Sequence, residues 1–126
     1  MAFLLQKERG DLPLHEVSLA EEILRIVESA AAEQHFSKVQ SLTLEVGELA
    51  GVESEALEFA LTHMAPGTLL EGARVILVNI PGRGHCAFCN AWVPIDFIHS
   101  ACSSCGQQPL LDLEGTELRV RDLEVN

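Results

Sequence analysis

Four cysteines are the residues whose types and spacing point most directly to chemistry. They form two Cys-x-x-Cys pairs, Cys86-Ala87-Phe88-Cys89 and Cys102-Ser103-Ser104-Cys105, with twelve residues between the pairs. Each pair can bend so that its two sulfurs point to one place, and two pairs supply four thiolates for one tetrahedral ion. This is the ligand set of structural zinc, with no position left for water or substrate. The spacing predicts one structural zinc ion per chain, although iron can occupy the same four sulfurs.

A dithiol redox pair is the alternative chemistry for such cysteines. It needs one Cys-x-x-Cys near a βαβ pattern and an exposed cysteine of low pKa, whereas this chain has two pairs and shows no such pattern. His85 and His99 lie beside the cluster. Either histidine can replace a thiolate, contact a ligand from outside, or simply lie exposed on a small lobe. The tetrathiolate zinc site is the favoured interpretation.

His15, followed by Glu16, is a second candidate for metal chemistry. A lone histidine at the start of a helix is usually a solvated loop residue. The chemical alternative is nickel or copper held in a square plane by the imidazole and backbone nitrogens. A helix N-terminus repels cations, but two deprotonated amides would cancel the charge of a divalent ion. His35 and His63 have no partner at metal-ligand spacing, so among the histidines away from the cysteines only His15 stays open as a ligand.

Two helices are expected, separated along the chain by a strand. Ser18-Leu19-Ala20-Glu21 has the form of a capping box, and apolar residues recur behind it at helical spacing. This predicts a helix from about Leu19 to Gln34. A second helix is expected from about Ser54 to Met64, with Phe59 among its apolar residues.

Three strands complete the expected elements. Alternation of apolar and polar residues from Ser41 to Val46 predicts a half-buried strand, and the apolar run Arg74–Ile80 predicts a strand covered on both faces. The last strand lies within Glu117–Val125. The predicted class is α+β, with two helices packed on a small three-stranded sheet and a zinc-ribbon-like lobe inserted between the second and third strands.

The chain divides, on this interpretation, into three parts. Residues 1–14 are an N-terminal extension, residues 15–81 form an α/β body completed by the strand within 112–126, and residues 82–111 form the zinc-binding lobe. Pro81-Gly82-Arg83-Gly84 is expected to be a flexible joint. A lobe of about 30 residues buries too little surface to fold without a staple such as zinc.

The charge and the apolar runs exclude several classes of protein. The 126 residues carry 19 acids and 8 Lys or Arg, a formal net charge of −11, which argues against binding nucleic acid or an anionic membrane surface. The longest apolar runs are too short for a membrane helix or a secretory signal, so we expect a cytoplasmic protein without membrane insertion. No catalytic constellation is present, so the chain is not expected to be an enzyme.

Several separated motifs give the chain a family resemblance. His15-Glu16-Val17-Ser18-Leu19-Ala20 resembles the Met-His-Glu-x-Ser-Leu opening of the hydrogenase nickel-incorporation proteins, the HypA/HybF family. The resemblance continues through Leu44–Glu53, through Gly67–Ala73 and through both cysteine pairs. It covers about residues 15–126, and the motifs agree with the family in order and spacing.

The resemblance implies a nickel metallochaperone for the maturation of [NiFe] hydrogenase. It implies transferable Ni(II) held near His15 and Glu16, and one structural Zn(II) held by Cys86, Cys89, Cys102 and Cys105. The implied partners are a nickel-handling GTPase and the hydrogenase large subunit, and some family members also serve urease. A zinc-ribbon adaptor without transferable nickel is the alternative, and it would be indifferent to His15.

One departure from the family concerns the residues before His15. In the family the histidine follows the initiator Met, whose free amine can join imidazole and amide nitrogens around nickel. Here Met1–Leu14 come first, so the nitrogen of Leu14 is a peptide amide and Pro13 has no N–H to lose. This predicts weaker or differently coordinated nickel in the full chain. The other interpretation is that translation begins at position 14.

Overall fold

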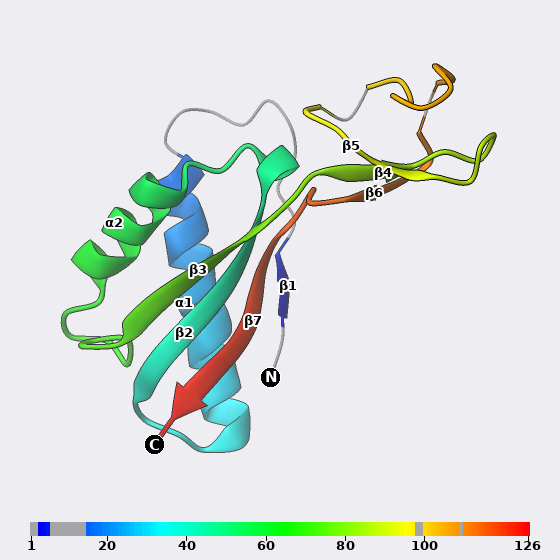
Figure 1. Ribbon diagram of the computed structural model, residues 1–126. Helices are drawn as coiled ribbons and strands as arrows, with labels where there is room; N and C mark the ends of the chain where they lie inside the picture. The colour runs from blue at the N-terminus through cyan, green and yellow to red at the C-terminus, as the bar shows by residue number, and fades with distance from the viewer. Residues whose placement is uncertain (1–2, 6–14, 98–99, 109) are drawn as a thin grey trace.

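A four-stranded sheet with two helices and a smaller three-stranded sheet make up the protein (Figure 1). The computed structural model describes residues 3–5, 15–97, 100–108 and 110–126, with only the backbone of residues 3–5 and 15. The predicted α+β class is confirmed. In chain order the elements are β1 Phe3–Leu5, α1 His15–Gln34, β2 Val39–Gly47, the 3₁₀ turn η1 Glu48–Ala50, α2 Ser54–Met64, β3 Arg74–Ile80, β4 Arg83–His85, β5 Trp92–Pro94, β6 Asp112–Glu114 and β7 Leu118–Val125.

The larger sheet has the strand order β1-β7-β2-β3. β2 is antiparallel to β7 and parallel to β3, and η1 and α2 form the crossover between the two parallel strands. A βαβ unit is therefore present in the body, which the sequence pattern did not reveal. β1 pairs with the outer edge of β7 and adds a fourth strand to the three expected, while residues 6–14 of the predicted extension lie outside the described residues.

Both helices pack on one face of the larger sheet, where the main hydrophobic core lies. Apolar residues at helical spacing on α1 meet alternate residues of β2 and β7, because successive side chains of a strand point to opposite faces. The buried members of this core are Leu19, Ala20, Ile23, Val27, Ala30, Phe36, Val39, Leu42, Leu44, Val46, Leu57, Ala60, Leu61, Leu70, Leu118 and Val120.

The strands differ from their predicted exposure. β2 was expected to be half-buried, but Ser41 and Thr43 on its polar side are also buried, because β2 lies between two neighbouring strands. The prediction that β3 is covered on both faces is wrong, since β3 forms an edge of the sheet and its residues are half-buried or exposed. Burial in this sheet follows the position of each strand more closely than its apolar content.

The two helices test the predicted boundaries. α2 spans Ser54–Met64 as predicted, but Phe59, which was counted among its apolar residues, is 64 % exposed. α1 begins at His15, four residues before the predicted start, so the capping-box prediction is wrong and Ser18 is an exposed residue of the first turns. Glu16 favours the earlier start, because a carboxylate in the first turn of a helix interacts well with its dipole.

The smaller sheet, with the order β5-β4-β6, forms the cysteine-bearing lobe at one end of the molecule (Figure 1). Residues 112–114 pair with β4 in this sheet, whereas 118–125 pair with β2 in the body, so the stretch 112–126 is shared between the two sheets. The lobe core consists of Cys86, Val93, Ile95, Cys102 and Leu110, with Leu49 of η1 packed against it. A core this small agrees with the expectation that the lobe needs a metal.

The connection between body and lobe is tightly packed, contrary to the flexible joint that was predicted. Gly82 is buried, and a Cβ atom there would lie 2.8 Å from the carbonyl oxygen of Ile95 and 2.8 Å from Cγ of Leu49. A Cβ on Gly47 would overlap the backbone of Gly115. Backbone hydrogen bonds cross the same place, from the N–H of Leu49 to Gly115 (2.7 Å) and from the N–H of Gly47 to Glu117 (2.9 Å). The lobe is therefore packed directly against the end of the body.

Candidate metal centre

Two matching backbone turns hold the cysteines. The N–H of Asn90 donates to the carbonyl of Cys86 (2.8 Å), and the N–H of Gly106 donates to the carbonyl of Cys102 (2.8 Å). The residue after each second cysteine is left-handed, with φ of 59° at Asn90 and 80° at Gly106. Asparagine and glycine are the residues that adopt this conformation most readily. The sequence thus provides both turns with the residue that their geometry requires.

The two turns bring all four sulfurs to one point. The ligand atoms of Cys86, Cys89, Cys102 and Cys105 lie within 4.8 Å of one another. The short contacts join different pairs, with Sγ of Cys86 3.6 Å from Sγ of Cys105, and Sγ of Cys89 3.7 Å from Sγ of Cys102. A zinc ion with Zn–S bonds of about 2.3 Å places its tetrahedral sulfurs roughly 3.8 Å apart. The donor set and its spacing fit one zinc ion.

The local environment prepares part of the cluster for ionisation. The backbone N–H groups of Cys105 and Ser104 outweigh burial and lower the pKa of the Cys102 thiol to about 7. The N–H of Cys89 lowers the pKa of the Cys86 thiol in the same way. Desolvation raises the pKa of Cys89. Each pair therefore contains one thiol set to become a thiolate, which is the form that binds a metal.

Of the two histidines beside the cluster, the structure describes His85 but not His99. His85 is half-buried, with its Nε2 2.8 Å from Oδ1 of Asn90 and its Nδ1 3.7 Å from Oδ2 of Asp112. Because both ring nitrogens face other side chains and the four cysteines already meet, His85 supports the first turn from outside the ligand set. In the sequence, the contact between His85 and Asn90 is indicated only by their positions directly before and directly after the first Cys-x-x-Cys pair. His99 lies outside the described residues.

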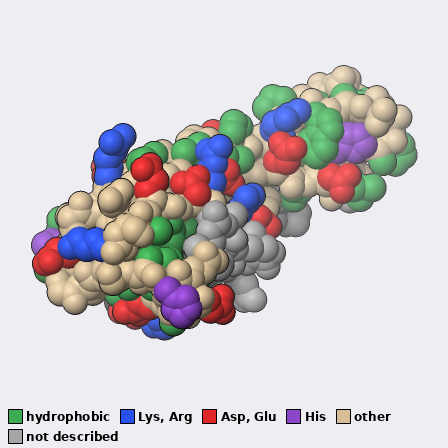
Figure 2. Space-filling model, turned by 90° about the horizontal axis from the view of Figure 1, so that it is seen from below, with side chains coloured by type: hydrophobic (Ala, Val, Ile, Leu, Met, Phe, Trp, Pro, Cys, Tyr) green, Lys and Arg blue, Asp and Glu red, His purple; other side chains and the backbone are tan. Residues whose placement is uncertain are grey.

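The surface of the lobe carries exposed apolar side chains. Figure 2 shows hydrophobic side chains gathered on the lobe. The large exposed apolar residues of the described part of the lobe are Phe88, Trp92, Phe97 and Leu111. The guanidinium carbon of Arg83 lies 5.3 Å from the ring centroid of Trp92, and the His85 ring packs 5.1 Å away from the same ring. Exposed apolar clusters of this kind are typical of surfaces that contact another protein.

The second candidate site lies at the start of α1. His15 is the first residue of the helix, and its side chain is not among the described parts of the structure. Glu16 is only 9 % exposed, and its Oε2 accepts a hydrogen bond of 3.2 Å from the backbone N–H of Glu53. Glu16 therefore ties the first turn of α1 to the segment that begins α2. The sequence did not reveal this role, because Glu53 contributes only its backbone.

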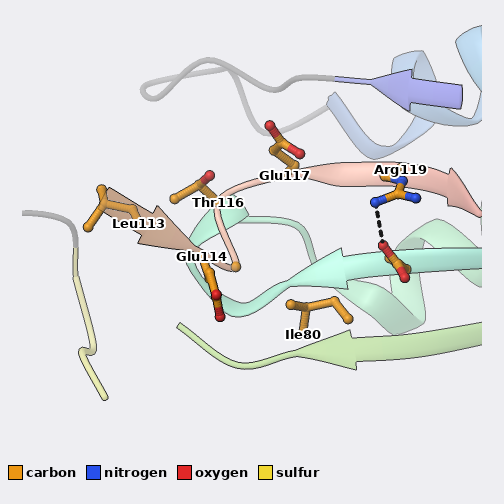
Figure 3. Close-up of a pocket in the computed structure, with 8 residues that line it drawn as sticks. Ile80, Leu113, Glu114, Thr116, Glu117 and Arg119 are labelled. Carbon is orange, nitrogen blue, oxygen red and sulfur yellow. Dashed lines mark ion pairs between the residues drawn. The ribbon is translucent and has the colours of Figure 1, made fainter. Parts of the chain in front are cut away.

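A cavity of about 250 Å³ lies at the junction between the body and the lobe. Figure 3 shows Ile80, Leu113, Glu114, Thr116, Glu117 and Arg119 around it. Its charged side chains are engaged, since Arg119 lies 3.3 Å from Glu45 and Arg83 lies 3.3 Å from Glu114. The cavity brings together none of the residues predicted as metal ligands. Its position marks the contact between the two sheets.

Comparison with known proteins decides the family. The family described as "Hydrogenase/urease nickel incorporation, metallochaperone, hypA" matches residues 14–125. The chain belongs to the HypA family. A "Hydrogenase maturation factor HypA" of Azotobacter chroococcum mcd 1 is 46 % identical over 112 residues, covering 89 % of this chain and 99 % of the relative. The corresponding factor of Polaromonas naphthalenivorans (strain CJ2) is 48 % identical over 112 residues, covering 89 % of this chain and 97 % of the relative.

The fold is likewise that of HypA proteins. The solution structure of the Ni metallochaperone HypA from Helicobacter pylori matches with a TM-score of 0.65 and 18 % sequence identity, covering 87 % of this chain and 96 % of that one. A second solution structure of a HypA protein matches with a TM-score of 0.67 and 19 % sequence identity, covering 91 % of this chain and 98 % of that one. Family membership and the two-part fold therefore agree with the resemblance found in the sequence.

Proposed function

We propose that this chain is a nickel metallochaperone of hydrogenase maturation. The observation that carries the proposal is the HypA family match over residues 14–125, a region that contains both the His15-Glu16 motif and the four-cysteine cluster. Relatives 46 % and 48 % identical are named as hydrogenase maturation factors. A carrier needs no nucleophile or general acid, in keeping with a protein that is not an enzyme.

The two metals have different roles in this proposal. Zinc bound by Cys86, Cys89, Cys102 and Cys105 is structural, since four thiolates close its coordination sphere and the lobe has few other buried side chains. Nickel is the cargo, held at the start of α1 by His15 and backbone nitrogens. A mixed nitrogen site at the end of a helix can release its ion more readily than a closed thiolate cage.

In addition to its proposed part in the nickel site, Glu16 positions the start of α1. Its carboxylate accepts a hydrogen bond from the N–H of Glu53, so it fixes the first turn of α1, which begins at His15. Glu16 was predicted as part of the nickel site.

The proposed partners are those that the family implies. A nickel-handling GTPase and the [NiFe] hydrogenase large subunit receive or guide the nickel, and urease maturation proteins are further partners of some members. The lobe offers Phe88, Trp92, Phe97 and Leu111 as a docking surface for one of them. The cytoplasmic location stays a prediction. Among the described residues, neither helix combines the length and apolar character needed to cross a bilayer.

The alternative function is a zinc-ribbon adaptor that binds proteins and carries no transferable nickel. It would keep the four cysteines and the apolar surface of the lobe. An adaptor of this kind would not need His15. The two functions therefore differ in what a change at His15 does to nickel binding.

Nickel titration of the zinc-loaded protein tests the proposal. We expect His15→Ala to weaken nickel binding by about 100-fold or more, because loss of a direct ligand costs at least as much as loss of a residue supporting one. His35→Ala is the matched control, since His35 directly follows the far end of the same helix, and its affinity should equal that of the wild type. Equal nickel affinity in His15→Ala and wild type would support the adaptor instead.

Two further variants refine the ligand set in the same titration. Glu16→Gln keeps an oxygen that can accept the Glu53 N–H, so a loss of affinity there would identify the carboxylate charge as a contributor to nickel binding. A chain that begins with Met immediately before His15 has a free amine next to the imidazole. We expect this shortened chain to bind nickel more tightly than the full chain, because an amine binds without first losing an amide proton.

A further inference from the structure

An apolar groove runs between the two helices on the outside of the body. It encloses about 460 Å³ and is lined by Glu16 and Val17 of α1 and by Ala56, Phe59, Ala60, His63 and Met64 of α2. The α2 residues recur at intervals of three and four, so they form one stripe along the helix. The floor of this stripe belongs to the core, since Ala60 is buried there and Met64 packs against it. Phe59 and His63 are exposed members of the stripe.

Phe59 is the largest side chain of this stripe and is held in place although it is exposed. Its ring packs edge-on against the ring of His63, with 4.2 Å between the centroids and an angle of 77° between the planes. Phe59 is 64 % exposed and Val17 on the facing helix is 47 % exposed. A fixed, exposed aromatic side chain beside a hollow is the usual form of an interface anchor. Phe59 is not part of the core, so its ring is available to a partner that enters the groove.

The charge around the groove restricts that partner. α1 and α2 together carry seven acids (Glu16, Glu21, Glu22, Glu28, Glu33, Glu55 and Glu58) against one base, Arg25. Glu55 lies one turn from Phe59, and Glu21 lies one turn from Val17, so acids border the stripe on both helices. Lysine or arginine side chains on a partner would be attracted here, and acidic surfaces would be repelled.

Two other occupants of the groove fit less well. A second copy of this chain would bring its own net charge of −11 and the same acidic helices against the groove. The apolar residues Phe3–Leu5 of the chain's own N-terminal segment pair with β7, at the opposite edge of the sheet from β3. Neither a second copy nor this strand matches the groove.

We propose that the α1–α2 groove, with Phe59 as its anchor, binds a basic amphipathic helix of a partner protein. Apolar side chains of that helix fill the hollow between Val17 and Phe59, and its Lys or Arg residues face Glu21 and Glu55. The groove begins at the turn that contains His15 and Glu16. If nickel is carried there as proposed above, a helix in the groove lies next to the cargo, and only this last point rests on the proposed function.

A synthetic helical peptide of leucine and lysine serves as the probe, with leucines at every third or fourth position. Its control is a peptide of the same composition with the leucines scattered around the helix. Fluorescence anisotropy of the labelled peptides is measured with zinc-loaded, nickel-free protein. Because nickel is absent, failure of the nickel proposal leaves this test unaffected.

We expect Phe59→Ser to weaken binding of the amphipathic peptide by about tenfold, as loss of an interface anchor does, and Val17→Ser to weaken it as well. Thr62→Ser is the matched control, since Thr62 is an exposed residue of the same helix that does not line the groove. Its affinity should equal that of the wild type. Each of these side chains is exposed, so the variants retain their cores.

Three results would overturn the proposal. Equal binding by Phe59→Ser and Thr62→Ser, or equal binding of the scattered peptide, would show general attraction to an acidic protein. A concentration-dependent dimer that Phe59→Ser abolishes would make a second copy the occupant. Peptide binding only after removal of residues 1–13 would make the chain's own N-terminal segment the occupant.

Discussion

Replacing Cys86 with serine is expected to release the zinc ion and unfold the lobe while the body stays folded. Cys86 is the buried member of the first pair, and its sulfur contacts that of Cys105 across the cluster at 3.6 Å. Structural zinc contributes about 10–16 kcal/mol of binding free energy to small zinc-dependent folds, and that energy is folding energy. The lobe core contains three buried residues besides cysteine, Val93, Ile95 and Leu110, which is too little to replace the metal.

Two measurements on the purified variant check this expectation. Elemental analysis should fall from one zinc per chain to nearly none, and amide hydrogen exchange should lose protection in β4, β5 and β6 while β2 keeps it. Ser104→Ala is the matched control, because Ser104 contacts Sγ of Cys102 through its backbone N–H, which alanine retains. A Cys86→Ser protein with a full zinc content and a protected lobe would contradict the tetrathiolate site.

Gly115→Ala is expected to be strongly destabilising at the junction between the body and the lobe. Gly115 has φ of +78°, and a Cβ atom there would lie 2.5 Å from the carbonyl oxygen of Pro81. Both the left-handed backbone and the clash with backbone atoms oppose any side chain. We expect a loss of about 3 kcal/mol, which corresponds to a fall of roughly 10 °C in melting temperature for a domain of this size.

Gly72→Ala separates the two causes of that loss. Gly72 also has a positive φ, +74°, but nothing lies within 4 Å of a Cβ built there. Gly72→Ala should therefore cost only about 1 kcal/mol, the strain of the backbone alone. Thermal unfolding followed by circular dichroism compares the two variants. If Gly115→Ala melts at the same temperature as Gly72→Ala, the junction is looser than the structure indicates.

Local patterns predicted the elements whose signals lie within one segment. The bounds of α2 and β3 and the convergence of the four cysteines follow from spacing, because helical periodicity and the Cys-x-x-Cys turn are local properties. The start of α1 was misplaced because Ser18 has a capping sequence, whereas Glu16 finds its partner 37 residues away at Glu53. A hydrogen bond to a distant backbone group leaves no pattern in the sequence.

Features that depend on pairing between distant segments could not be predicted. β1, β4, β5 and β6 have three residues each, too few for a periodic signal, and they are strands because a neighbour is present. Pro81-Gly82-Arg83-Gly84 has the composition of a flexible joint. In the structure, however, Gly82 and Gly115 lie where neighbouring backbones pack too closely to admit a side chain. The exposure of Phe59 also depends on which face of α2 meets the sheet.

The nickel ligands themselves give the most direct test of the central claim that cargo and structural metal occupy separate sites. The measurement is nickel-edge X-ray absorption of the zinc-loaded protein with one equivalent of nickel. We expect only nitrogen and oxygen ligands around nickel, with an imidazole contribution that His15→Ala removes. Sulfur ligands around nickel, or a spectrum unchanged in His15→Ala, would contradict the assignment of nickel to the start of α1.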